Sequence, residues 1–261
     1  MIRLTFLLRR LPGTSRDDFQ RYWRDEHAPL VAGLSGLLGM RRYVQVHTID
    51  DELADLMRRA RGGMEEPYDG VAEVWWDDEA VFTSAASSAE GQQAAAALLE
   101  DEAEFIDLPR SPMWLAHEYP QVNPTPETLV ARPRSGLVKL FFPLRMRADQ
   151  GVDAGQRYWQ TQHGPLIRSQ AAGSGILRYV QVHRFETPLE AGLRESRGTA
   201  VDAYDGHAEL WFDRANLSLA SAERSAAARR AVEDEGRFAD FARSSLWLAH
   251  EHVVVDRLGS D

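Results

Sequence analysis

The sequence predicts an α+β fold in which two ferredoxin-like βαββαβ domains form an intramolecular pseudo-dimeric α+β barrel. The first observation behind this prediction is a tandem repeat: the decapeptide RYWRDEHAPL at residues 21–30 returns 136 residues later as RYWQTQHGPL. Three shorter strings, RYVQVH, YDG and WLAHE, also occur once in each half. The second observation is the order of the expected elements in each half. That order is strand, helix, strand, strand, helix, strand, as in the split βαβ motif.

Length suggests one or two domains, the repeat sets the number at two, and the composition favours a soluble protein. The 261 residues are 44% hydrophobic and 27% charged, as in ordinary globular proteins. No apolar run approaches the roughly 18 residues of a membrane span, and the apolar opening is too short for a signal peptide. A formal net charge of −10 disfavours nucleic acid and anionic membranes as partners. The lack of cysteine excludes disulfides and fits a cytoplasmic location.

The first domain is expected at residues 1–119. Its first strand alternates with period two from Ile2 to Leu8. A helix then begins at Thr14 or Ser15, and we expect Pro29 to end it at His27 or Ala28. The other elements are a strand at 42–48, an exposed charged helix at 50–61, a strand at 69–76, an alanine-rich helix from the capping box Ser87–Glu90 to about Ile106, and a strand at 111–119.

A stiff linker with four prolines is expected at residues 120–136. The second domain follows at residues 137–255 and repeats the pattern of the first. Its expected elements are a strand at 137–145, a helix at 153–164, a strand at 177–183, an exposed helix at 188–196, a strand at 205–212, a helix at 218–242 and a strand at 245–254.

The two faces of each sheet differ in kind. One set of alternating residues is apolar and suits the side that the helices cover: Ile2, Leu4, Phe6, Val44 and Val46. The other set mixes aromatic and polar groups, so we expect it to line a cavity inside the barrel. This set comprises Arg3, Tyr43, Gln45, His47, Glu73 and Trp75, with Lys139, Tyr179, Gln181, His183, Glu209 and Trp211 as equivalents in the second half.

Three pairs of histidines recur in the repeat, and two of the pairs are candidates for catalysis. His27 and His163 end an apolar helix face, where each could act as a general acid or base or could interact with free carbonyls at the helix end. His47 and His183 are expected on the cavity face, and the alternative is an exposed position at a strand end. One carboxylate of each adjacent pair, Asp101–Glu102 and Asp234–Glu235, could fix the tautomer of His27 or His163, and the other could be a solvated helix residue.

Glu73 and Glu209 are the candidate buried carboxyls. Burial raises the pKa of a carboxyl and makes it a usable acid or base, and the alternative is a salt bridge to Arg3 or Lys139. His117–Glu118 and the repeated His250–Glu251 cannot chelate one ion together, because adjacent strand residues point to opposite faces. We therefore predict no metal, and no Walker, GxGxxG or GxSxG motif indicates a nucleotide cofactor or a serine nucleophile.

These motifs resemble the EthD family, which belongs to the dimeric α+β barrel superfamily. In the first half the resemblance lies in Tyr22, Trp23, His27, Pro29, Leu30, Asp101, Glu102 and Phe105. In the second half it lies in Tyr158, Trp159, His163, Pro165, Leu166, Asp234, Glu235 and Phe238. The second half departs from the first, since Gly155 replaces Phe19, Gly164 replaces Ala28, and Gln160 and Gln162 replace Arg24 and Glu26. The resemblance implies small, apolar or aromatic substrates and relatives that work without cofactors.

We therefore predict a cofactor-free enzyme of the lyase or isomerase type that acts on a small hydrophobic, aromatic or polyketide-like molecule. Its acid–base groups would be His27, His163, His47, His183, Glu73 and Glu209. Its substrate-binding residues would be Tyr22, Trp23, Tyr43, Gln45 and Trp75, together with Tyr158, Trp159, Tyr179, Gln181 and Trp211. The alternative is a non-catalytic protein that binds such a molecule for a partner oxygenase. We expect a monomeric pseudo-dimer, with both further homodimerisation and activity in only one half left open.

Overall fold

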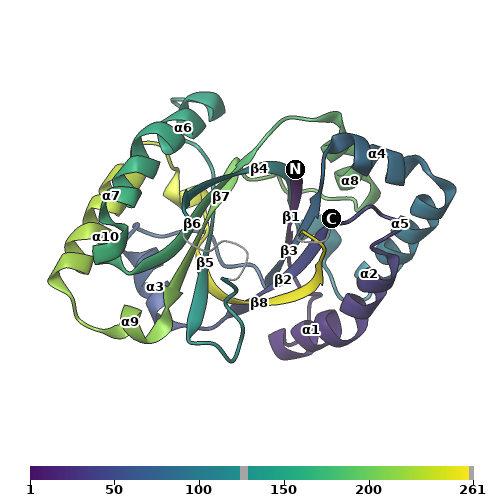
Figure 1. The fold of residues 1–261 in the computed structure, drawn as a ribbon, viewed down its shortest axis with the longest axis horizontal. Helices are drawn as coiled ribbons and strands as arrows, with labels where there is room; N and C mark the ends of the chain where they lie inside the picture. Colours follow the sequence, from purple (N-terminus) through teal and green to yellow (C-terminus); the bar gives the residue numbers. More distant parts are fainter. Residues whose placement is uncertain (124–128, 259–261) are drawn as a thin grey trace.

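The two halves of the chain form one closed barrel in the computed structural model, which describes residues 1–123 and 129–258 (Figure 1). The strand order is β1-β3-β2-β8-β5-β7-β6-β4. The first half contributes β1 (Ile2–Leu8), β2 (Arg42–Ile49), β3 (Gly70–Trp76) and β4 (Met113–Val122). The second contributes β5 (Leu137–Leu144), β6 (Ile176–Arg184), β7 (Gly206–Asp213) and β8 (Trp247–Asp256). This arrangement confirms the predicted pseudo-dimeric α+β barrel.

The barrel closes where the edge strands of the two sheets pair. β2 runs antiparallel to β8, with Val44 opposite Val253, and β4 runs antiparallel to β6, with His117 opposite His183. Closure removes the unpaired strand edges that each four-stranded sheet would otherwise present to solvent. The helices consequently lie outside the barrel, in two groups at opposite ends of the molecule (Figure 1). No helix of the described residues has the length and apolar character to cross a membrane.

The helix α3 (Glu52–Arg59) and its equivalent α8 (Pro188–Ser196) cross over to the opposite half. Figure 1 shows α8 beside α4 and α5 of the first half, and α3 on the side of α10. Leu189 and Leu193 of α8 pack against the first hydrophobic core, and Ala54 of α3 is buried in the second. Both helices fall where the sequence predicted them, but the expectation that they are exposed is wrong because each covers the other half's core.

The proline after His27 does not end the helix, contrary to our expectation. The chain runs through α1 (Arg16–Tyr22), a π-helical turn η1 (Trp23–His27) and α2 (Ala28–Leu34). The wider π-turn closes with a bond from the Ala28 N–H to the Trp23 carbonyl, and Pro29 then stands in the first turn of α2, where no N–H is required. The second half repeats this with α6 (Val152–Tyr158), η3 (Trp159–His163) and α7 (Gly164–Ser174).

The helices expected from the capping box Ser87–Glu90 to about Ile106 and at residues 218–242 are both shorter than predicted, and a separate short helix that we did not predict precedes each of them. In the first half α4 (Glu79–Ser87) precedes α5 (Ala89–Glu102), with Ser88 as the N-cap of α5. In the second half α9 (Arg214–Ser218) precedes α10 (Ala222–Glu235), capped by Ser221. Short 3₁₀ turns follow at Leu108–Arg110 and Phe241–Arg243. A serine side chain that bonds the backbone N–H three residues later begins a new helix, which explains the break.

The segment predicted to be a linker at residues 120–136 is partly built into the barrel. β4 continues to Val122, and the chain returns at Ala131, which is fully buried. Ala131 forms two hydrogen bonds with Glu251: its N–H donates to the side-chain carboxylate at 2.7 Å, and its carbonyl accepts from the Glu251 N–H at 2.7 Å. Residues 124–128 of the predicted linker lie outside the described residues.

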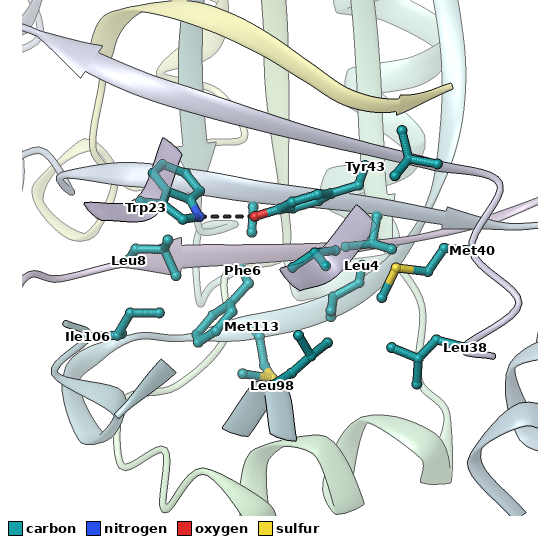
Figure 2. Packing of buried hydrophobic residues seen from close by; sticks show 14 of the residues in the cluster. Leu4, Phe6, Leu8, Trp23, Leu38, Met40, Tyr43, Leu98, Ile106 and Met113 are labelled. Carbon is teal, nitrogen blue, oxygen red and sulfur yellow. Dashed lines mark hydrogen bonds between the residues drawn. The ribbon is translucent and has the colours of Figure 1, made fainter. Parts of the chain in front are cut away.

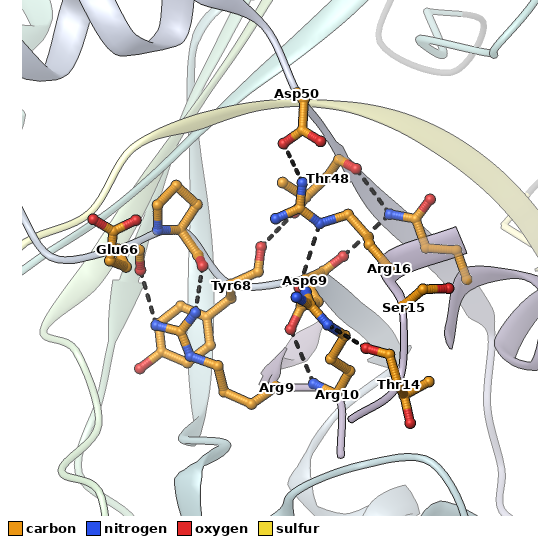
Figure 3. Close-up of polar contacts among 12 residues, drawn as sticks. Arg9, Arg10, Thr14, Ser15, Arg16, Thr48, Asp50, Glu66, Tyr68 and Asp69 are labelled. Atoms are coloured by element: carbon orange, nitrogen blue, oxygen red, sulfur yellow. Dashed lines mark hydrogen bonds and ion pairs between the residues drawn. The ribbon is translucent and has the colours of Figure 1, made fainter. Parts of the chain in front are cut away.

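The repeated YDG motif has a structural role at the end of the first sheet (Figure 3). Asp69 accepts hydrogen bonds from the side chains of Arg10 and Arg16, and Arg9 stacks on the ring of Tyr68. Gly70 lies directly under Trp23, so that an added Cβ would come within 2.4 Å of the indole ring. The motif therefore fixes the loop and leaves room for the tryptophan.

Charged and aromatic side chains fill the interior of the barrel, where the sequence predicted a cavity. Arg3 contacts Glu73 at 2.6 Å and also binds Glu209, and Lys139 lies 2.7 Å from Glu73 and 3.0 Å from Glu209. The surrounding core is largely aromatic and includes Tyr68, Trp75, Trp114, Phe141, Tyr204, Trp211 and Trp247. The salt-bridge alternative that we considered for Glu73 and Glu209 is therefore the one found in the structure.

The pKa values of the equivalent carboxyls Glu73 and Glu209 are shifted in opposite directions. Burial raises the pKa of Glu73 to about 8, against the opposing effect of Arg3. Burial also acts on Glu209, but the charges of Arg3 and Lys139 outweigh it and hold the pKa of Glu209 well below its usual value. The neutral His207 adds a contact of 3.3 Å to Glu209, and the first half has Val71 at that position. One histidine therefore helps to break the twofold symmetry of the cluster.

We expect Glu73→Gln and Glu209→Gln to differ sharply in stability. Glu73→Gln puts a neutral group where the folded state holds a proton that the unfolded chain releases, so at pH 7 it should raise the free energy of unfolding, by up to about 3 kcal/mol. Glu209→Gln removes an anion that balances two buried cations and should cost about 3 kcal/mol or more. Urea unfolding followed by tryptophan fluorescence measures both.

The raised pKa of Glu73 also predicts that the free energy of unfolding depends on pH. The folded state keeps the Glu73 proton up to about pH 8, whereas the unfolded chain releases it near 4.5. Stability associated with that proton is lost as the pH rises between these values, by at most about 1.4 kcal/mol per pH unit. Glu73→Gln should flatten this slope. Equal losses in the two variants would contradict the assigned protonation states.

Candidate functional site

Each half contains an apolar pocket between its sheet and its helices. The first pocket has a volume of about 150 Å³ and the second about 200 Å³. Figure 2 shows the packing around the first, where Leu4, Phe6 and Leu8 of β1 lie near Trp23, Tyr43 and Leu98. Many lining residues are identical in the two repeats: Leu4/Leu140, Phe6/Phe142, Leu8/Leu144, Trp23/Trp159, His27/His163, Tyr43/Tyr179, Ala72/Ala208 and Glu102/Glu235.

A histidine–aspartate pair lies at each pocket. His27 lines the first pocket, and its Nδ1 is 2.6 Å from Asp101, which also accepts a 2.9 Å hydrogen bond from the Tyr22 hydroxyl. A carboxylate on Nδ1 holds the proton of the neutral imidazole there and leaves Nε2 as a proton acceptor. The expectation that one carboxylate of each adjacent pair orients this histidine is confirmed.

The second half repeats this geometry. His163 Nδ1 lies 2.8 Å from Asp234, and the Tyr158 hydroxyl donates to the same carboxylate at 2.8 Å. The hydrogen bond from His163 lowers the pKa of Asp234, so the aspartate stays anionic and can stabilise a protonated imidazole. Tyr22 and Tyr158, which we predicted to contact substrate, each donate a hydrogen bond to the aspartate that holds the histidine.

The π-turn positions the tryptophan and the histidine together. The Trp23 carbonyl, which closes the π-turn, also accepts a 2.6 Å hydrogen bond from the Gln45 side chain, and the Trp23 indole N–H donates to the Tyr43 hydroxyl at 3.0 Å. Tyr43 Oη accepts a second bond from Gln45 at 3.2 Å. Because this hydroxyl accepts both bonds, its own proton is left to donate, and Tyr43 lines the pocket.

The expected placement of Tyr43, Gln45 and His47 inside the barrel is wrong. All three lie on the helix side of β2, and Val44 and Val46 face the barrel interior instead. The same reversal holds for Tyr179, Gln181 and His183 on β6, with Val180 and Val182 inside. On the helix side, the tyrosine hydroxyl and the histidine ring of each strand contact the tryptophan of the π-turn. The two valines of each strand pack in the barrel interior.

His47 and His183 support the tryptophans. His47 stacks on Trp23 with ring centroids 4.6 Å apart and contacts the Gln45 side chain at 3.1 Å. His183 stacks on Trp159 at 4.4 Å. Burial lowers the pKa of His47 well below its usual value and lowers the pKa of His183 to about 3. Both rings are therefore neutral near pH 7 and poorly suited to exchanging protons with a substrate.

Glu73, Glu209, Trp75 and Trp211 lie in the barrel interior, on the other side of the sheet from the pockets. The indole of Trp75 donates to Glu118 at 2.9 Å, and that of Trp211 donates to Glu251 at 2.8 Å. Glu73, His207 and Glu209 hold ligand atoms within 4.8 Å of one another. Arg3 and Lys139 already supply the positive charge at these carboxylates, so a metal ion would compete with two fixed cations.

Each pocket also receives an arginine from the opposite half. Arg197, which follows α8, lines the first pocket and binds Glu102 through two hydrogen bonds of 2.7 and 2.9 Å. Arg61, which follows α3, binds Glu235 of the second pocket at 2.8 and 3.0 Å. The expectation of a solvated second carboxylate is therefore wrong. Sequence reasoning missed both arginines, although their spacing of 136 residues was a usable signal.

Comparison with known proteins agrees with this architecture. The EthD domain model matches residues 11–109 and 147–242, so the chain belongs to the EthD family and carries two EthD domains in tandem. No match was found among curated proteins.

Among solved structures, an anthrone oxidase-like protein aligns with 100% of this chain and 95% of its own, at 9% identity and a TM-score of 0.54. A Fusobacterium nucleatum protein provisionally named a monooxygenase aligns with 97% and 92%, at 6% identity and a TM-score of 0.50. At these identities the likeness concerns the fold.

We expect Arg197→Met to loosen the first pocket and Arg61→Met the second. Each change leaves a buried carboxylate without its cation, at a cost of about 1–3 kcal/mol. Hydrogen exchange should rise in α5 for Arg197→Met and in α10 for Arg61→Met, although each mutated residue belongs to the other half. Arg59→Met, at an exposed position of α3, serves as the control. If amide hydrogen exchange increased only in the half that carries the mutation, the assignment of each arginine to the pocket of the opposite half would be contradicted.

Proposed function

We propose that each pocket binds a small hydrophobic, aromatic molecule and that His27 and His163 move a proton on it as general acid–base groups. The observation that carries this proposal is the histidine–aspartate pair, which occurs in both halves with Nδ1–carboxylate distances of 2.6 and 2.8 Å at the border of an apolar pocket. General acid–base groups of this kind accelerate reactions by about 10²–10⁴-fold.

The other polar groups of the pocket fit this role. Asp101 stabilises the imidazolium that forms when His27 Nε2 accepts a proton, and the Tyr43 hydroxyl can donate a hydrogen bond to an oxygen of the substrate. Arg197 binds the Glu102 carboxylate through two hydrogen bonds. A dehydration, decarboxylation, cyclisation or isomerisation can proceed by such proton transfers without a nucleotide cofactor. His47, His183, Glu73 and Glu209 have no part in this mechanism.

The size of the pockets indicates the size of the molecule. A cavity of about 150 Å³ accommodates benzene, and the two pockets have volumes of about 150 and 200 Å³. We therefore propose a ligand with one aromatic ring for the conformation described, and a polyketide of several rings would require the helices to move outward. The names of the two fold relatives refer to oxidation of small molecules, which agrees with a small-molecule site and leaves the reaction type open.

The first experiment is native mass spectrometry of the purified protein, with identification of any small molecule released on denaturation. The molecule found is then assayed for turnover. We expect His27→Gln with His163→Gln to lower kcat by about 100-fold or more while the dissociation constant changes by less than about threefold. Each single variant measures how much of the total turnover its own half contributes.

Matched variants separate catalysis from binding. His117→Gln alters the repeated histidine that stacks on Phe185 outside the pockets and should keep the wild-type rate. Turnover that persists in the double variant would refute the role of the histidines. A wild-type protein that binds the molecule and never converts it would support the alternative, a binding protein that serves a partner oxygenase.

A further inference from the structure

The outer ends of the two pockets differ in chemistry, although their inner ends are alike. Ser174 lines the second pocket at a position where the first has Leu38, and Gln170 stands where the first half has Leu34. Arg224 also lines the second pocket, and its equivalent in the first half is Gly91. Three polar side chains thus replace two leucines and a glycine.

The first half cannot carry a side chain at the position of Arg224. A Cβ added to Gly91 would lie 1.9 Å from the Ala85 carbonyl oxygen, because α4 runs up against α5 at this point. In the second half α9 has five residues where α4 has nine, and the repeat spacing drops from 136 to 133 between YDG and WLAHE. The shorter segment of the second half therefore leaves room for an arginine beside the second pocket.

Arg224 has unused hydrogen-bonding capacity. Its Nη1 donates to the carbonyls of Asn216 and Leu219 at 2.6 and 2.9 Å, which fix the side chain. Its Nε is buried and has no hydrogen-bond partner, and within residues 1–123 and 129–258 no carboxylate forms an ion pair with it. By contrast, Arg61 and Arg197 are both neutralised by a glutamate. The guanidinium of Arg224 lines the second pocket without a carboxylate of the described residues to neutralise it, so an anionic ligand could bind it there.

We infer that the two pockets take different ligands: the second binds a small aromatic carboxylate whose anionic end meets Arg224, and the first binds a neutral aromatic molecule. This inference rests on the proposed function, because it assumes that both pockets bind small aromatic compounds. Arg224 is then the specificity-determining residue of the second pocket. Ser174 and Gln170 provide polar surroundings for the anionic end of the ligand.

The test compares para-fluorobenzoate with para-fluorobenzyl alcohol by fluorine NMR titration of the full chain. We expect the alcohol to bind both pockets and the benzoate to bind one. Arg224→Leu should weaken benzoate binding by about tenfold or more, as expected for the loss of a charge-assisted hydrogen bond, and should leave alcohol binding within about threefold. Arg229→Leu, at an exposed position on the same helix, should behave as wild type.

A second variant tests the pocket without removing the charge. Ser174→Leu introduces the residue of the first half and should weaken benzoate binding, whereas Leu38→Ser should leave it unchanged. Benzoate affinity that is insensitive to both Arg224→Leu and Ser174→Leu would overturn the inference. Alcohol binding without benzoate binding would also overturn it and would leave the proposed function standing. Binding of neither compound to the wild-type protein would overturn the proposed function and this inference together.

Discussion

The pairing of β2 with β8 and of β4 with β6 is the constraint on which the rest of the structure depends. It closes two four-stranded sheets into one barrel, so the polar strand faces around Arg3 and Lys139 become an interior and the helices are confined to the outside. It also brings each crossover helix onto the opposite half, where Arg61 and Arg197 reach the carboxylates of the other pocket. The two pockets are therefore interdependent parts of one unit.

Around each pocket, one hydrogen-bonded frame determines the geometry. The π-turn, the tyrosine and the glutamine hold the tryptophan by its carbonyl and its indole nitrogen, and the stacked histidine covers the other side of the ring. Each of these bonds contributes only about 0.5–1.5 kcal/mol, but together they specify one position for the catalytic candidate His27. These contacts give a structural role to Trp23, Tyr43, Gln45, His47 and Gly70, which belong to the strings RYW, RYVQVH and YDG that recur in both halves.

Departures from twofold symmetry fall outside this frame. In the barrel, His207 contacts Glu209, and Val71 stands at the equivalent place beside Glu73, and the pKa values of these two related carboxyls shift in opposite directions. In the pockets, the three-residue deletion before α10 gives Arg224 a place that Gly91 cannot provide. The duplication thus preserved the machinery that positions His27 and His163 while the surroundings diverged.

The sequence by itself determined the duplication, the order of the strands and the pseudo-dimeric barrel, and it suggested that one of two adjacent carboxylates pairs with His27, because repeats and hydrophobic periods can be seen directly in the chain. It could not determine which face of β2 points inward, since a period of two groups Tyr43 with Gln45 and His47 but assigns no side to the group. It also could not show that a π-turn carries the helix past Pro29, or that Arg197 reaches Glu102 from the other half. Those outcomes depend on contacts between residues far apart in the chain, and only the closed barrel brings them together.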